Sequence, residues 1–242
     1  MNRSILIVIS SLILAVSCSK ITTLQSLDFN ETASDPKAIT LANQVVDANG
    51  GAKAWNKTRY ISWNFFGSRK HIWDKQTGDV FIKSLKSPVE IKMNLNDKTG
   101  KVWLNGEETM NQDSISKYLD SGYAWWVNDS YWLILPFKLM DSGVTLNYIG
   151  EGTTLSGSAA NMLSLNFEAT GLTPNNKYHI YIDKTTKRIH QWDFYTNASD
   201  PDPRFQLPWA DYKRYGDIYL SGNRGKYELT EIEVGKHLAD ML

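Results

Sequence analysis

The feature that most constrains the fold of this chain is an alternation of apolar and polar residues, which returns at three places. In each segment every second residue is apolar, so one face of an extended strand is buried and the other is polar. The apolar sets are Ile61, Trp63 and Phe65; Val89, Ile91, Met93 and Leu95; and Leu163, Leu165 and Phe167. This alternation is typical of half-buried strands in an antiparallel sheet.

Turns of one chemical type separate several of the expected strands. The segments 74–78, 97–100 and 183–187 each begin with Asp-Lys, and the first two end on Gly. The Asp side chain accepts hydrogen bonds from the turn backbone, and Gly adopts the positive φ that closes a short hairpin. In the third segment Lys187 stands in place of the glycine, which we expect to cost some stability. Asn105-Gly106 predicts another hairpin.

Residues before the first expected strand show helical spacing. Apolar residues recur with a helical period from Ala38 to Ala48, and Pro36 suits the first turn of a helix. Ser34 or Asp35 is the expected cap, and Gly50-Gly51 ends the helix.

A second helical region interrupts the strands at about 113–140. Asp113 to Val127 has one broad apolar face, after which Asn128-Asp129-Ser130 supplies a new cap and Pro136 kinks or ends the helix. The order helix, strands, helical insert, strands predicts a single, mainly β domain over 37–242. We expect one curved antiparallel sheet, an incomplete barrel, with helices covering its concave face.

The late hairpin around 183–188 carries apolar or aromatic residues on both faces, so both faces are expected to be covered. Strict alternation predicts His179, Tyr181, His190, Trp192 and Phe194 on one face and Tyr178, Ile180, Ile182 and Ile189 on the other.

The N-terminus resembles a bacterial lipoprotein signal. A short basic start is followed by an apolar segment, 5–16, which is too short to span a bilayer comfortably, and small residues precede Cys18, the only cysteine. We expect residues 1–17 to be the signal peptide, Cys18 to be lipidated, and 18–36 to form a tether. The alternative is an ordinary secretory signal with an incidental cysteine. Ser19 and Lys20 follow Cys18, and by resemblance to the enterobacterial sorting rule the lack of an acidic residue there argues against retention at the inner membrane, so we expect the outer membrane of the bacterial cell envelope.

Composition and motifs exclude several function classes. With 26 Lys and Arg against 26 Asp and Glu, the chain lacks the basic excess of a nucleic-acid binder. The sequence contains no serine-hydrolase elbow, His-Glu-x-x-His motif, P-loop or dinucleotide fingerprint. The polar residues His179, Asp183, His190 and Asp193 are expected to be structural, because alternation separates Asp193 from His190. We therefore predict no enzyme activity, no catalytic residue, no cofactor and no metal site.

Three motifs carry a resemblance to a family. They are Gly50-Gly51-x-x-Ala54-Trp55, Trp132-Leu-x-x-Pro136-Phe137-Lys138-Leu139 followed by Asp141-x-Gly143-Val144, and His190-Gln191-Trp192-Asp193. These motifs resemble a group of uncharacterised lipoproteins of Bacteroidota-type bacteria, which is similar to the LolA/LolB lipoprotein-carrier superfamily. The resemblance implies an incomplete barrel whose helices close an apolar cavity for acyl chains. It implies a lipid or acyl chain as partner, the membrane through Cys18, and an envelope protein as a further partner.

The expected function is binding or carriage of an apolar ligand. Broad apolar walls suit acyl chains, so the aromatic insert is a candidate lid or lining of the cavity. The candidate ligand-binding residues are Trp63, Phe65, Trp125, Trp126, Trp132, Leu133, Leu135, Phe137 and Trp192. The alternative is a non-catalytic structural or interaction lipoprotein, in which the same aromatic residues fill the core and no small ligand binds.

Overall fold

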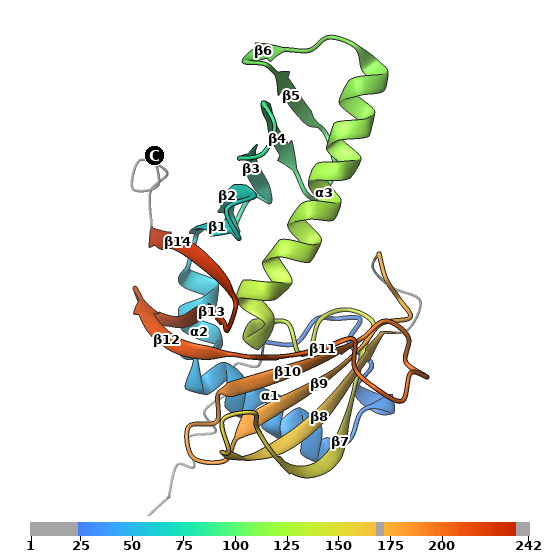
Figure 1. Cartoon of the computed structure of the whole chain (residues 1–242), viewed down its shortest axis with the longest axis vertical. Helices are drawn as coiled ribbons and strands as arrows, with labels where there is room; N and C mark the ends of the chain where they lie inside the picture. Colours follow the sequence, from blue (N-terminus) through green and yellow to red (C-terminus); the bar gives the residue numbers. More distant parts are fainter. Residues whose placement is uncertain (1–23, 168–171, 236–242) are drawn as a thin grey trace, which may run out of the picture.

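Two antiparallel sheets and three helices form the structure, a computed structural model that describes residues 24–167 and 172–235 (Figure 1). The expected signal peptide and Cys18 lie outside the described residues. The helices are α1 (Pro36–Ala48), α2 (Gly51–Lys57) and α3 (Gln112–Ile134), with the 3-10 turns η1 (Glu31–Ala33) and η2 (Leu135–Phe137).

The larger sheet has nine strands. In spatial order they are β12 (Ala210–Tyr215), β13 (Ile218–Arg224), β14 (Tyr227–Gly235), β1 (Tyr60–Phe65), β2 (Arg69–Asp74), β3 (Asp79–Ser84), β4 (Val89–Asn94), β5 (Gly100–Leu104) and β6 (Glu107–Glu108). The smaller sheet has five strands, in the order β11 (Phe205–Pro208), β10 (Ile189–Tyr195), β9 (Lys177–Asp183), β8 (Ala159–Phe167) and β7 (Val144–Thr153). The predicted fold class, an unclosed antiparallel β structure with a long helix, is confirmed.

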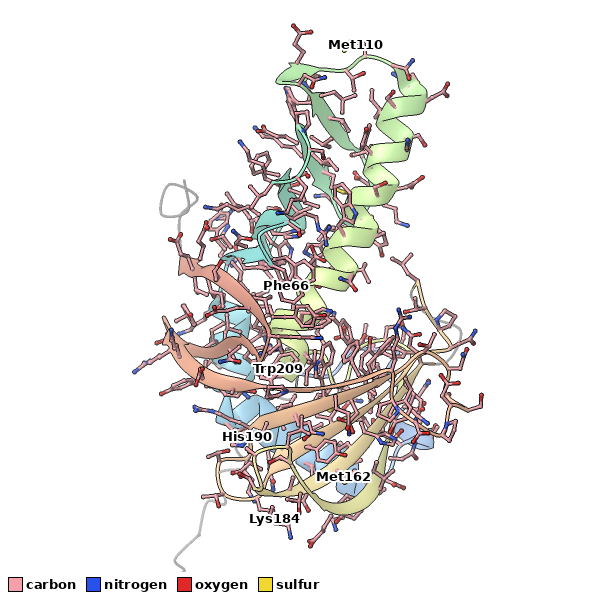
Figure 2. The ribbon with its side chains drawn as sticks, viewed as in Figure 1. Phe66, Met110, Met162, Lys184, His190 and Trp209 are labelled. Atoms are coloured by element: carbon pink, nitrogen blue, oxygen red, sulfur yellow. The ribbon has the colours of Figure 1, made fainter. Side chains whose placement is uncertain are left out.

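The expectation of one sheet is wrong, because the chain changes sheets at a single residue. β11 pairs with β10 in the smaller sheet, and β12 pairs with β13 in the larger one. Only Trp209 separates β11 from β12, and its side chain is fully buried where the two sheets meet (Figure 2). One extended segment thus contributes an edge strand to each sheet.

Each sheet has its own helix. α3 crosses one face of the nine-stranded sheet and buries Trp63, Ile82 and Ile91 beneath it (Figure 1). Gly122 permits this close approach, since a Cβ there would lie 3.0 Å from the Ile91 side chain. α1 packs instead on the five-stranded sheet, where its buried side chains and those of that sheet form a second core. Among the described helices, none is both long and apolar enough to cross a bilayer.

The folded part begins before residue 37, inside the segment expected to be a tether. The backbone N–H of Asn30 donates to the carbonyl of Val144, and Phe29 is buried in the second core. The expected caps of α1 also contact β7, because the side chains of Ser34 and Asp35 accept hydrogen bonds from its backbone. Residues 24–35 therefore pack against the domain.

The helical insert is one continuous helix as far as Ile134, so the second cap expected at 128–130 is wrong. Asp129 lies inside α3, where its buried carboxylate accepts hydrogen bonds from β2 and does not cap a new helix. Pro136 ends the helix in η2, as expected.

The expected faces of the late hairpin are also wrong. A β-bulge between Ile189 and Gln191 shifts the register of β10 by one residue. Trp192 therefore lies opposite Ile180, and Phe194 opposite Tyr178, on the inner face. A one-residue shift moves every following side chain to the other face, which is why alternation alone failed here.

The turn chemistry is mostly as predicted. Asp74, Asp97 and Asp183 each accept hydrogen bonds from the backbone of their own turn. Asn105-Gly106 has the two positive φ angles, 55° and 85°, of a two-residue hairpin turn. In the turn at 97–100, however, the positive φ of 59° belongs to Lys98 and not to Gly100.

Lys187 adopts a φ of 58°, a backbone conformation that residues other than glycine rarely adopt. We expect Lys187→Gly to stabilise the fold by about 0.5–1 kcal/mol, because glycine reaches this region without the Cβ clash. Urea unfolding measures the difference. Thr185→Gly in the same turn is the control and should destabilise by a similar amount, since Thr185 has no positive φ to relieve. A loss of stability in Lys187→Gly would contradict the prediction.

Candidate functional site

An aromatic cavity of about 480 Å³ lies between the C-terminal half of α3 and the inner face of the five-stranded sheet. α3 contributes one wall, the segment 138–142 and the loop at 172–176 contribute the rim, and strands β8 to β11 contribute the opposite wall. Its lining is Tyr123, Trp126, Val127, Asn128, Ser130, Tyr131, Trp132, Lys138, Asp141, Ser142, Phe167, Leu172, Thr173, Asn176, Tyr178, Trp192, Phe194 and Phe205.

The walls are rings in direct contact. Tyr178 stacks on Trp192 with centroids 5.4 Å apart, and Trp132 meets the Trp192 ring edge-on at 4.7 Å. Burial raises the pKa of Tyr178 to about 12 and raises the pKa of Tyr131 well above its usual value, so both phenols are neutral. The Tyr131 hydroxyl has no hydrogen-bond partner among the described residues. The cavity thus offers broad, uncharged contact surface.

Charge is confined to the rim. Of the described residues that line the cavity, only Lys138 and Asp141 are charged, and they form an ion pair with each other. The Lys138 ammonium also lies 5.4 Å from the centroid of the Tyr131 ring. The other described lining residues are aromatic, aliphatic or neutral and polar, and the polar ones are Asn128, Ser130, Ser142, Thr173 and Asn176.

Three of the nine candidate ligand-binding residues line this cavity: Trp126, Trp132 and Trp192. The other six lie elsewhere. Trp63, Phe65, Leu133 and Phe137 belong to the core under α3, and Leu135 to the core under α1. Trp125 is half-buried on α3, with the Arg69 guanidinium 5.3 Å from its ring.

Sequence reasoning missed several lining residues, above all Tyr131, Tyr178, Phe194 and Phe205. Alternation placed Phe194 on the other face because it does not account for the β10 bulge, and Phe205 is the first residue of β11. The sequence did contain one usable signal, the high density of aromatic residues in β9 and β10. The alternation argument assigned these residues to the wrong faces.

The wall that α3 contributes is fixed by a buried ion cluster. Asp129 accepts two hydrogen bonds from Arg69, at 2.7 and 2.9 Å, and its Oδ2 lies 2.7 Å from Nε2 of His71. Both Asp129 and His71 are fully buried. Burial raises the pKa of Asp129, but the hydrogen bonds from His71 and Arg69 outweigh it and hold that pKa below its usual value. One carboxylate thus anchors the helix to β2.

The fold is similar to several solved structures at low sequence identity. A DUF1329 family protein from Desulfovibrio piger has 12% identity and a TM-score of 0.45, covering 86% of this chain and 96% of that one. A proposed outer membrane lipoprotein-sorting protein domain from Vibrio parahaemolyticus has 11% identity and a TM-score of 0.42, covering 85% and 96%. MucB has 12% identity and a TM-score of 0.29, covering 86% and 63%.

No protein-family model and no curated protein matches the sequence. The resemblance of its motifs to the LolA/LolB superfamily therefore stays a prediction.

Asp129→Asn should destabilise the protein by about 3 kcal/mol, because it removes the charge that the buried His71 and the half-buried Arg69 face. Chemical denaturation of the two proteins measures the change. Asp120→Asn is the matched control, since Asp120 is exposed on the same helix, and it should lie within about 0.5 kcal/mol of the wild type. A loss below about 1 kcal/mol in Asp129→Asn would show that the cluster does not anchor α3.

Stability should fall as the pH drops below about 6.5, the usual pKa of histidine. Burial lowers the pKa of His71 in the folded protein, so the unfolded chain takes up a proton there that the folded chain does not. His71 should lower the free energy of unfolding by on the order of 1 kcal/mol as the pH falls from 6.5 to 5.5.

His71→Gln should remove that contribution in urea unfolding measured at both pH values. A residual slope from His179, whose pKa burial also lowers, is measured separately in His179→Gln. An unchanged slope in His71→Gln would contradict the assignment.

Proposed function

We propose that the protein is a non-catalytic binding protein of the bacterial cell envelope, which holds the acyl chain of a lipid or lipoprotein in the aromatic cavity. The observation that carries the proposal is the cavity itself. Its volume of about 480 Å³ lies in the range of small-molecule sites, and nine of its eighteen described lining residues carry aromatic rings. Such a surface suits a flexible hydrocarbon, which needs contact area and no fixed polar partner.

The energetics of such binding are favourable. Burying one methylene group gains ~0.8 kcal/mol, so a ten-carbon segment gains on the order of 8 kcal/mol before the cost of ordering it. Micromolar affinity corresponds to roughly 8 kcal/mol, so moderate to weak affinity is expected once that cost is subtracted. Affinity in that range lets a ligand exchange with a membrane.

In this proposal, the N-terminal segment determines the cellular location of the protein. In the proposal, residues 1–17 direct export, the lipidated Cys18 holds the protein at the outer membrane, and the domain meets its ligand there. Two or more acyl chains anchor a protein far better than one. An envelope protein is the proposed donor or acceptor of the ligand.

A second function is favoured by one observation on the larger sheet. α3 fills the concave face of that sheet completely enough that Trp63, Ile82 and Ile91 are at most 1% exposed. A filled sheet is what a structural or interaction lipoprotein requires. This alternative predicts that no lipid occupies the cavity beside the smaller sheet.

Native mass spectrometry tests the proposal on protein that begins at Ser19 and so contains every described residue. Purified from a bacterial host without detergent, it should carry a species of lipid mass that is lost on organic extraction. The stripped protein should then bind 1-myristoyl lysophosphatidylcholine, followed by tryptophan fluorescence.

Phe194→Asp should weaken this binding at least about tenfold, because burial of a phenylalanine ring is worth about 1.5–3 kcal/mol. Phe81→Asp is the matched control, since Phe81 lies on a strand of the larger sheet and packs with Tyr60 and Ile72, away from the cavity. Its affinity should equal that of the wild type. Protein that carries no lipid and takes up none would favour the scaffold alternative.

A further inference from the structure

We infer that the protein selects lipids with an anionic headgroup, which binds in a basic groove next to the aromatic cavity. This inference rests on the proposed function and specifies its ligand. The groove lies between β11 and the turn that joins β13 to β14. Its lining is Phe66, Trp132, Phe194, Arg204, Phe205, Gln206, Leu207, Pro208, Arg224, Gly225, Lys226 and Tyr227.

Among the described residues, three cations and no carboxylate line the groove. Arg204 and Lys226 are exposed on its two sides, and neither forms an ion pair with any described residue. The two groove cations are therefore available to an anion from solution.

Beneath them lies Arg224, which is fully buried. Its guanidinium donates to the carbonyls of Trp132, Ser221 and Asn223 and to the Ser221 hydroxyl, all of which are neutral. Its Nε has no partner among the described residues. Buried charges in proteins are normally paired with an opposite charge. Arg224 has none, so its positive field acts on whatever occupies the groove above it.

The position of the groove selects a lipid over other anions. Groove and cavity share Trp132, Phe194 and Phe205 as lining residues. Phe194 stacks on Phe205 with centroids 5.0 Å apart, and Trp132 lies 5.6 Å from Phe205. A hydrocarbon bound on one side of these rings thus lies next to the cations on the other side. A lipid whose acyl chain is joined to an anionic headgroup matches this arrangement.

The groove side of these rings also suits the segment between chain and headgroup. Phe66 stacks on Tyr227 with centroids 5.3 Å apart, and both rings meet Trp132 edge-on (Figure 2 labels Phe66 at the base of α3). Tyr227 is 39% exposed, so an apolar surface leads from the cavity to Lys226.

Two probes with the same chain separate the headgroup from the acyl chain. 1-Myristoyl lysophosphatidylglycerol is anionic and 1-myristoyl lysophosphatidylcholine is zwitterionic, and both are titrated below their micelle-forming concentrations. The anionic lipid should bind about tenfold more tightly, since two exposed cations each contribute a modest charge-assisted contact. The preference should shrink between 10 and 500 mM salt, because exposed charges are screened.

The variant Arg204→Gln/Lys226→Gln should reduce the preference to below about threefold, and both positions are exposed, so folding is expected to be preserved. Lys117→Gln/Lys213→Gln removes two exposed cations outside the groove and should keep the tenfold preference. Equal affinity of the wild type for both lipids, or an unchanged preference in the groove variant, would overturn the inference and leave the proposed function standing. Failure to bind either lipid would overturn both.

Discussion

The buried guanidinium of Arg224 is the interaction on which both halves of the fold depend. It stacks 3.2 Å from the centroid of Trp209, the single residue at which the chain changes sheets. It also donates to the carbonyl of Trp132 in the last turn of α3, where backbone carbonyls lack helical partners. One side chain therefore joins the bend in the sheet to the end of the long helix. The partners of Arg224 are neutral oxygens and an aromatic ring. The loss of any one of these partners would therefore leave the buried guanidinium charge poorly solvated.

This junction separates the nine-stranded sheet, whose covered face is filled by packed side chains, from the part of the molecule that contains the cavity. Over the nine-stranded sheet, α3 lies close enough that a Cβ at Gly122 would crowd the Ile91 side chain, and the Asp129 cluster fixes the helix there. The C-terminal half of the same helix also faces the five-stranded sheet, and the aromatic cavity lies between them. The firm anchoring of the helix on one sheet is what allows a cavity to persist beside the other, since a loosely held helix would collapse onto the aromatic wall.

The sequence predicts local features of this fold well and long-range ones poorly. The turns at Asp74 and Asp183 and the end of the first helix at Gly50 depend on a few adjacent residues, and these were predicted correctly. Asp129 looked like a helix cap because its partners, 58 and 60 residues away, are invisible in local sequence. The β10 bulge leaves no comparable local mark, and it changes the face on which Trp192 and Phe194 lie.

The site lies at the junction because neither sheet encloses a ligand by itself. Trp132 packs against both cores, and its ring lines both the cavity and the groove. Its backbone carbonyl accepts a hydrogen bond from Arg224, so a residue that lines the proposed ligand site is also tied to the charge beneath the groove. A ligand in the cavity would therefore contact the Trp132 side chain, which also borders the proposed headgroup site. Chain and headgroup recognition are coupled through one residue, which is a geometric reason for a lipid to be recognised as a whole.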